Sequence, residues 1–310
     1  MVSKSDPSNP TRIVGKGVQR IDGAERVMGT AKYGADLSLP NTLHAKIKRS
    51  PHANARISKI SIEKAIAIPG VVAIVTSKDF PIIEFSDQVV GGEITMTPRD
   101  QRRMQLAEDK VFYHGQAVAA VAATSLEIAE FATESIDVEY EVFDPVVNVE
   151  EAVKENAPLV HDDLYTWEFA GSLSDKPSNV ARRVELSRGD PAEAFKNSDI
   201  IIERRFEGGT VHQGYIEPQA CTVDIVDDHL TVHTSSQINF NLRDTLATIL
   251  GRDKEAITVV PLEIGGGFGG KAGLGIEFIT ALLAIKANTC LLYTSDAADE
   301  RSSVDLGGRR

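Results

Sequence analysis

The sequence predicts an α+β protein, because stretches with the two-residue period of strands are interleaved with stretches of helical period. Residues 41–50 alternate apolar and polar side chains, as a half-buried strand does. Residues 117–141 read as a buried strand, a helix capped near Thr124 or Ser125 with Glu127 close by, and a second strand over 136–141. A strand over 256–264, a glycine-rich loop and a helix over 276–287 repeat the theme near the end of the chain.

The first unit, which we place at residues 15–150, is predicted to contain short strands and helices in mixed order. After the strand at 41–50, residues 55–80 predict a strand, a short helix from Ser61, a Pro-Gly turn and a Val/Ile strand. The polar, Pro-bearing residues 1–14 are predicted to be a disordered lead-in.

A linker is predicted over residues 151–191, where turn-forming residues are frequent and apolar periodicity is weak. A second unit follows over 192–288, its first apolar stretch being Ile200–Phe206. Two alternating strands flank Asp227-Asp228, which favours a tight hairpin, and an amphipathic helix ends at Gly251, a good helix C-cap.

Composition narrows the class of protein. The chain of 310 residues has room for about two domains, and its 42% hydrophobic and 25% charged residues are those of a globular protein. A net charge of -12 disfavours nucleic-acid binding, and no apolar run is long enough for a membrane span. Cys221 and Cys290 lie far apart, so we expect neither a disulfide framework nor a CxxC metal site, which suits a reducing cytoplasm.

Residues 289–310 do not continue the pattern. They interrupt the preceding helix, show no sustained period and resemble the translated read-through of a sequencing adapter. We therefore expect an artefactual tail without a core-forming element, and a genuine protein that continues past residue 288.

The glycine loop in EIGGGFGGKAGLG (263–275) is the main candidate site. Gly265, Gly267 and Gly270 match the dinucleotide-binding pattern G-x-G-x-x-G, but the acidic residue expected about 20 positions later falls in the tail. The phosphate-loop pattern fails at Ala272, where a hydroxyl is needed. A plain packing turn is the third interpretation. Phe268 between glycines favours a flat, partly anionic cofactor or an aromatic substrate.

Four blocks of sequence together resemble the molybdenum-binding subunit of the xanthine dehydrogenase/aldehyde oxidase family. The resemblance runs from about Gly15 to Ala287 and is carried by the following blocks: 15–57, 113–141, HQGYIEPQACTV with SSQINF, and IGGGFGGKAG. It implies an a/b-hammerhead domain followed by the first part of a molybdopterin-binding domain.

The resemblance also implies site residues. Gln237 corresponds to the family's glutamine near the apical molybdenum oxygen, and Gly266, Gly267, Phe268 and Gly269 to its cofactor-binding loop. A glutamine amide donates a hydrogen bond without adding charge, and glycines permit close approach. Phe268 and Ala272 are expected to line the substrate pocket.

Purine-oxidising members carry a carboxylate where Ala272 stands, so aldehydes, N-heteroaromatics or other aromatic compounds are the expected substrates. For His212, Tyr215 and Glu217, packing or hydrogen bonding is favoured over catalysis, and His114 and His233 are interpreted as structural.

The family's reaction hydroxylates a C–H bond with oxygen from water. The resemblance implies a molybdenum-molybdopterin cofactor, in its cytosine dinucleotide form, with [2Fe-2S] clusters and FAD on partner subunits. The family's catalytic glutamate lies beyond this chain, so no catalytic residue is assigned and the chain alone is expected to be inactive. A Rossmann-like nucleotide binder and a non-enzymatic assembly module are the alternatives.

Overall fold

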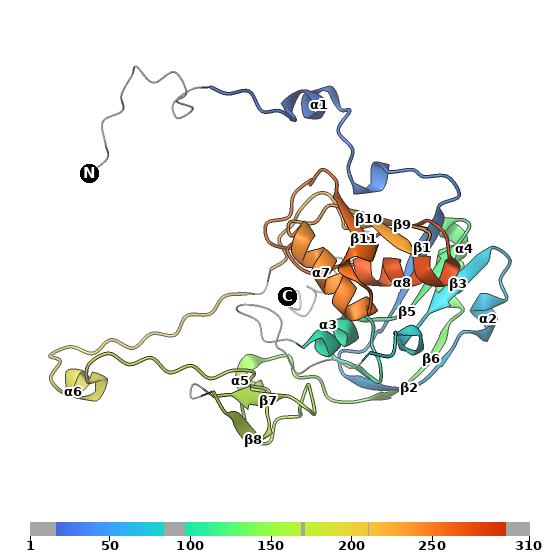
Figure 1. Cartoon of the computed structure of the whole chain (residues 1–310). Coiled ribbons are helices and arrows are strands. Elements are labelled where there is room, and N and C mark those ends of the chain that lie inside the picture. The colour runs from blue at the N-terminus through green and yellow to red at the C-terminus, as the bar shows by residue number, and fades with distance from the viewer. Residues whose placement is uncertain (1–16, 84–96, 169–170, 210, 296–310) are drawn as a thin grey trace, which may run out of the picture.

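The computed structural model describes residues 17–83, 97–168, 171–209 and 211–295 (Figure 1). The predicted lead-in at 1–14 and the last part of the predicted tail lie outside these residues. The helices are α1 (Gly23–Met28), α2 (Glu63–Ile66), α3 (Pro98–Gln105), α4 (Leu126–Glu134), α5 (Val149–Ala152), α6 (Pro191–Lys196), α7 (Asn239–Leu250) and α8 (Glu277–Ala287). None of the helices in these ranges has the length and apolar character needed to cross a bilayer.

A seven-stranded mixed sheet forms the centre of the described part of the chain. In spatial order its strands are β11 (Ile257–Pro261), β10 (His229–Thr234), β9 (Ala220–Val226), β12 (Leu291–Thr294), β1 (Leu43–Arg49), β5 (Ala117–Ala123) and β3 (Val71–Val75). The β10–β11 and β1–β12 pairs are parallel, and the other pairs are antiparallel. Early and late segments of the chain therefore share one sheet.

Helices cover both faces of this sheet. On one face lie α7 and α8 (Figure 1). They bury apolar side chains such as Leu246 and Phe278 in the largest hydrophobic cluster. On the other face, Ala132 of α4 and Ala65 of α2 pack against β5 and β3. β5 lies between these layers, and all seven of its residues are buried, which explains its unbroken run of small apolar residues.

Two smaller sheets complete the structure. β2 (Ala55–Ser61) pairs with β4 (Lys110–Val111) and β6 (Asp137–Val142), and β7 (Tyr165–Trp167) pairs with β8 (Leu173–Pro177). The last pair lies inside the region expected to be a linker.

Local sequence signals account for several boundaries. Asp227 and Asp228 both have positive φ, 49° and 67°, as the predicted tight hairpin between β9 and β10 requires. Gly251 ends α7 with a left-handed φ of 62°, and the Ser125 hydroxyl caps α4. These predictions are confirmed.

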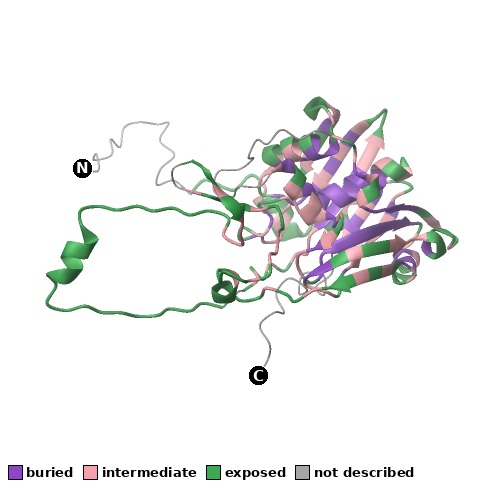
Figure 2. Cartoon of the chain, turned by 90° about the horizontal axis from the view of Figure 1, so that it is seen from below, coloured by how far each residue is buried: buried purple, intermediate pink, exposed green. Residues whose placement is uncertain are grey.

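Residues 184–209 form an exposed arm that carries α6 away from the rest of the molecule (Figure 2). Ile200–Phe206, expected to open the second unit, lies in this arm and forms neither a helix nor a strand. An ion pair of 2.8 Å between Arg205 and Glu150 joins the returning part of the arm to α5.

The expectation that residues 289–310 contribute no core-forming element is wrong for their described part. Leu291–Thr294 form β12, which lies between β9 and β1 and joins the two halves of the large sheet. Leu291 and Tyr293 are fully buried, whereas Leu292 and Thr294 are half-buried. Four residues with alternating buried and half-buried side chains are enough to form a strand between β9 and β1. So short a segment does not reveal a two-residue period in the sequence. The origin of residues 289–310 stays a prediction.

Candidate cofactor site

The glycine loop turns back on itself between β11 and α8. Gly266 and Gly269 have φ of 104° and 90°, and Phe268 between them has φ of 49°. A phenylalanine in the left-handed region is strained and persists only where the surroundings fix it. The N–H of Gly270 donates to the carbonyl of Gly267 at 2.7 Å, which closes the turn around Phe268.

Gln237, which follows β10, is bound to the far end of this loop. Its backbone N–H donates to the carbonyl of Lys271 at 2.9 Å. Its side-chain Oε1 accepts hydrogen bonds from the N–H groups of Gly269 and Lys271, each at 3.2 Å. Because two N–H donors require an acceptor, the oxygen of the Gln237 amide faces the loop. The amide NH2 group is then left to donate elsewhere.

Gly267 has to be glycine because Gln237 lies against it. A Cβ at this position would be 2.7 Å from Oε1 of Gln237 and 2.9 Å from its Cδ. Both distances are shorter than real Cβ contacts, so any side chain here displaces Gln237. The sequence thus couples this glycine to a glutamine 30 residues earlier.

Unused hydrogen-bond donors line the turn. Among the described residues, the N–H groups of Gly266, Gly267 and Phe268 have no hydrogen-bond partner, and neither does the NH2 group of Gln237. All four donors are uncharged. Such a set fits a ligand rich in acceptor atoms, as molybdopterin is, and offers it close backbone approach. The structure therefore brings together the predicted residues Gln237, Gly266, Gly267, Phe268 and Gly269.

Phe268 and Ala272 are both exposed, Phe268 by 74%. They lie on the outer side of the loop, as residues that face a ligand would. Their role in lining a substrate pocket stays a prediction.

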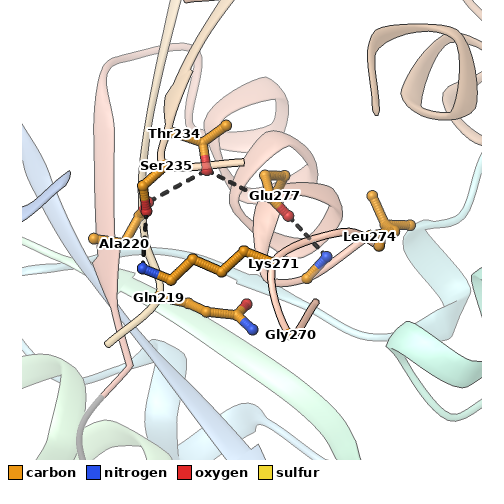
Figure 3. Close-up of a pocket in the computed structure, with 10 residues that line it drawn as sticks. Gln219, Ala220, Thr234, Ser235, Gly270, Lys271, Leu274 and Glu277 are labelled. Atoms are coloured by element: carbon orange, nitrogen blue, oxygen red, sulfur yellow. Dashed lines mark hydrogen bonds between the residues drawn. The ribbon is translucent and has the colours of Figure 1, made fainter. Parts of the chain in front are cut away.

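Behind the loop lies a polar cavity of about 60 Å³ (Figure 3). Its wall includes Lys271, Ser235 and Gln219 as well as Glu277, the first residue of α8. Glu277 is buried and accepts hydrogen bonds from the Thr234 hydroxyl and from the N–H of Gly275, both at 2.8 Å. Burial raises the pKa of the Glu277 carboxyl above its ordinary value of 4.5.

Substituting Glu277→Gln tests this pKa shift. Below pH 4.5 the folded and unfolded states both hold the proton, and as pH rises the unfolded state releases it first. The free energy of unfolding of the wild type therefore falls as pH rises through the folded-state pKa of Glu277. A glutamine at this position does not titrate and causes no such fall. We expect the stability of E277Q relative to wild type to increase from acidic to neutral pH, measured by urea unfolding. A difference that is independent of pH would contradict the shift.

The three histidines singled out in the sequence differ in their surroundings, and their structural interpretation stays a prediction. His212 packs edge-on against Tyr215 with ring centroids 4.9 Å apart, and its Nδ1 accepts from the N–H of Gly214. His114 is exposed, and burial lowers the pKa of His233 in β10. Cys221 and Cys290 are free and buried.

Sequence reasoning missed Lys271 and Glu277. In a phosphate loop Lys271 would reach towards the phosphates, whereas here its side chain is 3% exposed and forms an ion pair with Glu217. The sequence signal for a structural role of Lys271 was that it follows the glycine loop, while Ala272 lacks the hydroxyl that a phosphate loop needs.

The dinucleotide-binding alternative does not fit this geometry. The last loop glycine of its motif, Gly270, is separated from the start of α8 at Glu277 by six residues, so the motif does not lie at a helix N-terminus. In the dinucleotide motif the glycine loop follows the first strand of a βαβ unit, whereas here it follows the second, because β11 is parallel to β10 and is connected to it by α7.

Two family models match the chain. Residues 28–144 match the aldehyde oxidase and xanthine dehydrogenase a/b hammerhead domain, and residues 173–302 match the molybdopterin cofactor-binding domain. The chain therefore belongs to the aldehyde oxidase and xanthine dehydrogenase family, with a hammerhead domain followed by a molybdopterin-binding domain. This confirms the predicted fold class and family.

Curated relatives agree with the family models. The chain is 33% identical over 292 residues to a probable hypoxanthine oxidase of Escherichia coli K12, which covers 87% of this chain and 30% of the relative. It is 31% identical over 274 residues to the nicotinate dehydrogenase large molybdopterin subunit of Eubacterium barkeri, which covers 88% of this chain and 59% of the relative.

Solved structures agree as well. Quinoline 2-oxidoreductase of Pseudomonas putida 86 superposes with a TM-score of 0.77 at 27% identity, over 91% of this chain and 34% of that one. The chain spans about a third of the length of most of these proteins.

Proposed function

We propose that the glycine loop and Gln237 hold a molybdenum-molybdopterin cofactor, in its cytosine dinucleotide form, in the large subunit of a molybdenum hydroxylase. The supporting observation is the row of three unpartnered N–H groups at Gly266, Gly267 and Phe268 beside the outward NH2 group of Gln237. When bound, the cofactor supplies the two-electron oxidation of a C–H bond with oxygen from water.

The chain's own residues bind and orient in this scheme. The loop N–H groups and the Gln237 amide donate hydrogen bonds to acceptor atoms of the cofactor, and these neutral donors leave its charge unchanged. Phe268, held outward by the turn, forms an apolar wall for the substrate. No general base is assigned to any residue of this chain.

The proposed substrate is an aldehyde, an N-heteroaromatic or another aromatic compound. Ala272 offers only a methyl group where a purine substrate would need a hydrogen-bonding side chain. The relatives named for nicotinate and quinoline support the N-heteroaromatic class. One relative is named for hypoxanthine, which is a purine. The proposal that this protein does not oxidise purines therefore depends on Ala272.

Iron–sulfur and FAD subunits are the proposed partners. Several relatives are named as large chains or subunits, which implies further chains in their assemblies. These partners would hold the [2Fe-2S] clusters and the FAD and would supply the electron acceptors, and we place the assembly in the cytoplasm.

The 310-residue chain by itself is expected to bind added cofactor reversibly, to lose it during purification, and to oxidise no substrate. The test is elemental analysis, with turnover assays on benzaldehyde, quinoline and nicotinate using a dye as electron acceptor. Intact quinoline 2-oxidoreductase, purified in parallel, is the positive control. Stoichiometric molybdenum with turnover by residues 1–310 would contradict the proposal that chemistry needs more than this chain.

A further inference from the structure

A largely buried ion pair lies directly beneath the glycine loop. Lys271 Nζ is 2.7 Å from Oε2 of Glu217, and the two side chains are 3% and 12% exposed. Lys271 also contacts the Ser235 hydroxyl at 3.3 Å and lies 5.1 Å from the ring centre of Tyr215. Buried charges are costly unless they are paired and hydrogen-bonded, and here each charge has the other and at least one further hydrogen-bond partner.

The Glu217 carboxylate also binds two backbone segments. Oε2 accepts from the N–H of Gly265, the first glycine of the loop, at 2.6 Å. Oε1 accepts from the N–H of Gly34, in the segment that precedes β1, at 3.1 Å. One carboxylate thus joins the entry of the loop to the hammerhead part of the chain.

Lys271 provides the corresponding link at the exit of the loop. Its backbone N–H donates to Oε1 of Gln237, and its carbonyl accepts from the N–H of Gln237. Its side chain reaches back to Glu217, so the loop is held at both ends by one connected network. The three unpartnered N–H groups lie between these two fixed points.

We propose that Glu217 and Lys271 are positioning residues that fix the glycine loop, and through it the Gln237 amide, in the geometry that receives the cofactor. This rests on the proposed function only for what the loop binds; the positioning itself concerns the chain alone. The pair acts on the ligand through the loop and does not itself touch it.

A purely stabilising pair and a positioning pair respond differently to replacement of both partners. Removing one partner leaves a buried charge and lowers stability strongly, whereas two apolar residues of similar size restore much of it. The apolar pair cannot accept the N–H of Gly265, however. Stability and loop order are therefore separable in E217L/K271M.

The experiment measures amide hydrogen exchange by NMR in the 310-residue chain without cofactor, together with urea unfolding. The variants are E217L, K271M and E217L/K271M, with the milder E217Q for the case that E217L does not fold. E277Q is the matched control, because Glu277 is a buried glutamate of the same region but accepts hydrogen bonds from no cation.

The expected result has two parts. In E217L and in the double variant, the Gly265 amide exchanges about tenfold faster or more, exchange at Gly269 and Lys271 rises as well, and helices α7 and α8 keep their protection. E217Q shows the same pattern more weakly, and E277Q leaves loop exchange unchanged. The unfolding midpoint falls in E217L and recovers in the double variant, while loop exchange stays fast.

Two results would overturn the inference. Loop exchange that is unchanged in E217L or E217Q would show that the pair does not hold the loop. Loop exchange that recovers together with the midpoint in the double variant would assign the pair to stability alone. Failure of wild type to bind molybdopterin in a separate titration would instead count against the proposed function and leave the exchange result standing.

Discussion

Replacing Leu291 by alanine is expected to lower the free energy of unfolding by about 2–5 kcal/mol, the usual cost of truncating a fully buried leucine. Leu291 is fully buried in β12, at the centre of the seven-stranded sheet. Its neighbours on both sides are strands from distant parts of the chain, Leu43 in β1 and Val223 in β9. Little of the cavity can collapse, because the surrounding strands are held by the rest of the sheet. The measurement is equilibrium unfolding in urea, compared at constant m-value.

Leu292→Ala provides the matched control. It makes the same chemical change one residue along the same strand, where the side chain points to the opposite face and is only half-buried. We expect its cost to be well below that of L291A. Equal effects of the two substitutions, or no effect of either, would show that β12 does not occupy the central position.

Gly267→Ala is expected to displace the Gln237 side chain and to lower stability by about 1–3 kcal/mol. The added methyl group would lie 2.7 Å from Oε1 of Gln237. Because the end of a glutamine side chain is flexible, the protein can respond by moving Gln237. That movement breaks the two hydrogen bonds from the N–H groups of Gly269 and Lys271. We therefore expect a modest loss of stability and a large loss of order at the candidate site.

A double-mutant cycle checks this route. In a Gln237→Ala background there is no amide to displace, so the added effect of G267A on stability should shrink. Gly273→Ala is the control within the same segment, because a Cβ there meets nothing within 4 Å, and its effect should stay within about 0.5 kcal/mol. Full additivity of G267A and Q237A would contradict the proposed coupling.

Local signals made much of the fold predictable. The alternating residues of β1, the apolar run of β5 and the hairpin at Asp227-Asp228 all follow from side-chain period and turn chemistry within a few residues. Helix α3 was missed although Thr97 and Asp100 form a reciprocal cap with Pro98 between them. Its sequence is so polar that no apolar stripe marks it, and the cap was the remaining signal.

Long-range contacts explain what the sequence could not show. β12 gains its place from strands that lie about 70 and 250 residues earlier, and no local pattern carries that information. Glu217 and Lys271 are 54 residues apart, so their pairing follows from the fold rather than from spacing. For the loop, the family resemblance identified Gln237, Gly266, Gly267, Phe268 and Gly269 as a group. The structure adds why they belong together, since the Gln237 oxygen binds the loop and leaves its NH2 group outward.

The central claim is that the turn at Gly266–Phe268 and the Gln237 amide form the surface that receives the molybdenum cofactor. The most direct measurement is an anaerobic NMR titration of the 310-residue chain with molybdenum-loaded molybdopterin, following backbone amides and the Gln237 side-chain NH2 resonances. The account predicts saturable shifts centred on Gly266, Gly267, Phe268 and the Gln237 NH2 group, which weaken in G267A and persist in G273A. Saturable binding that leaves these four signals unmoved, or no binding by a correctly folded wild-type chain, would contradict it.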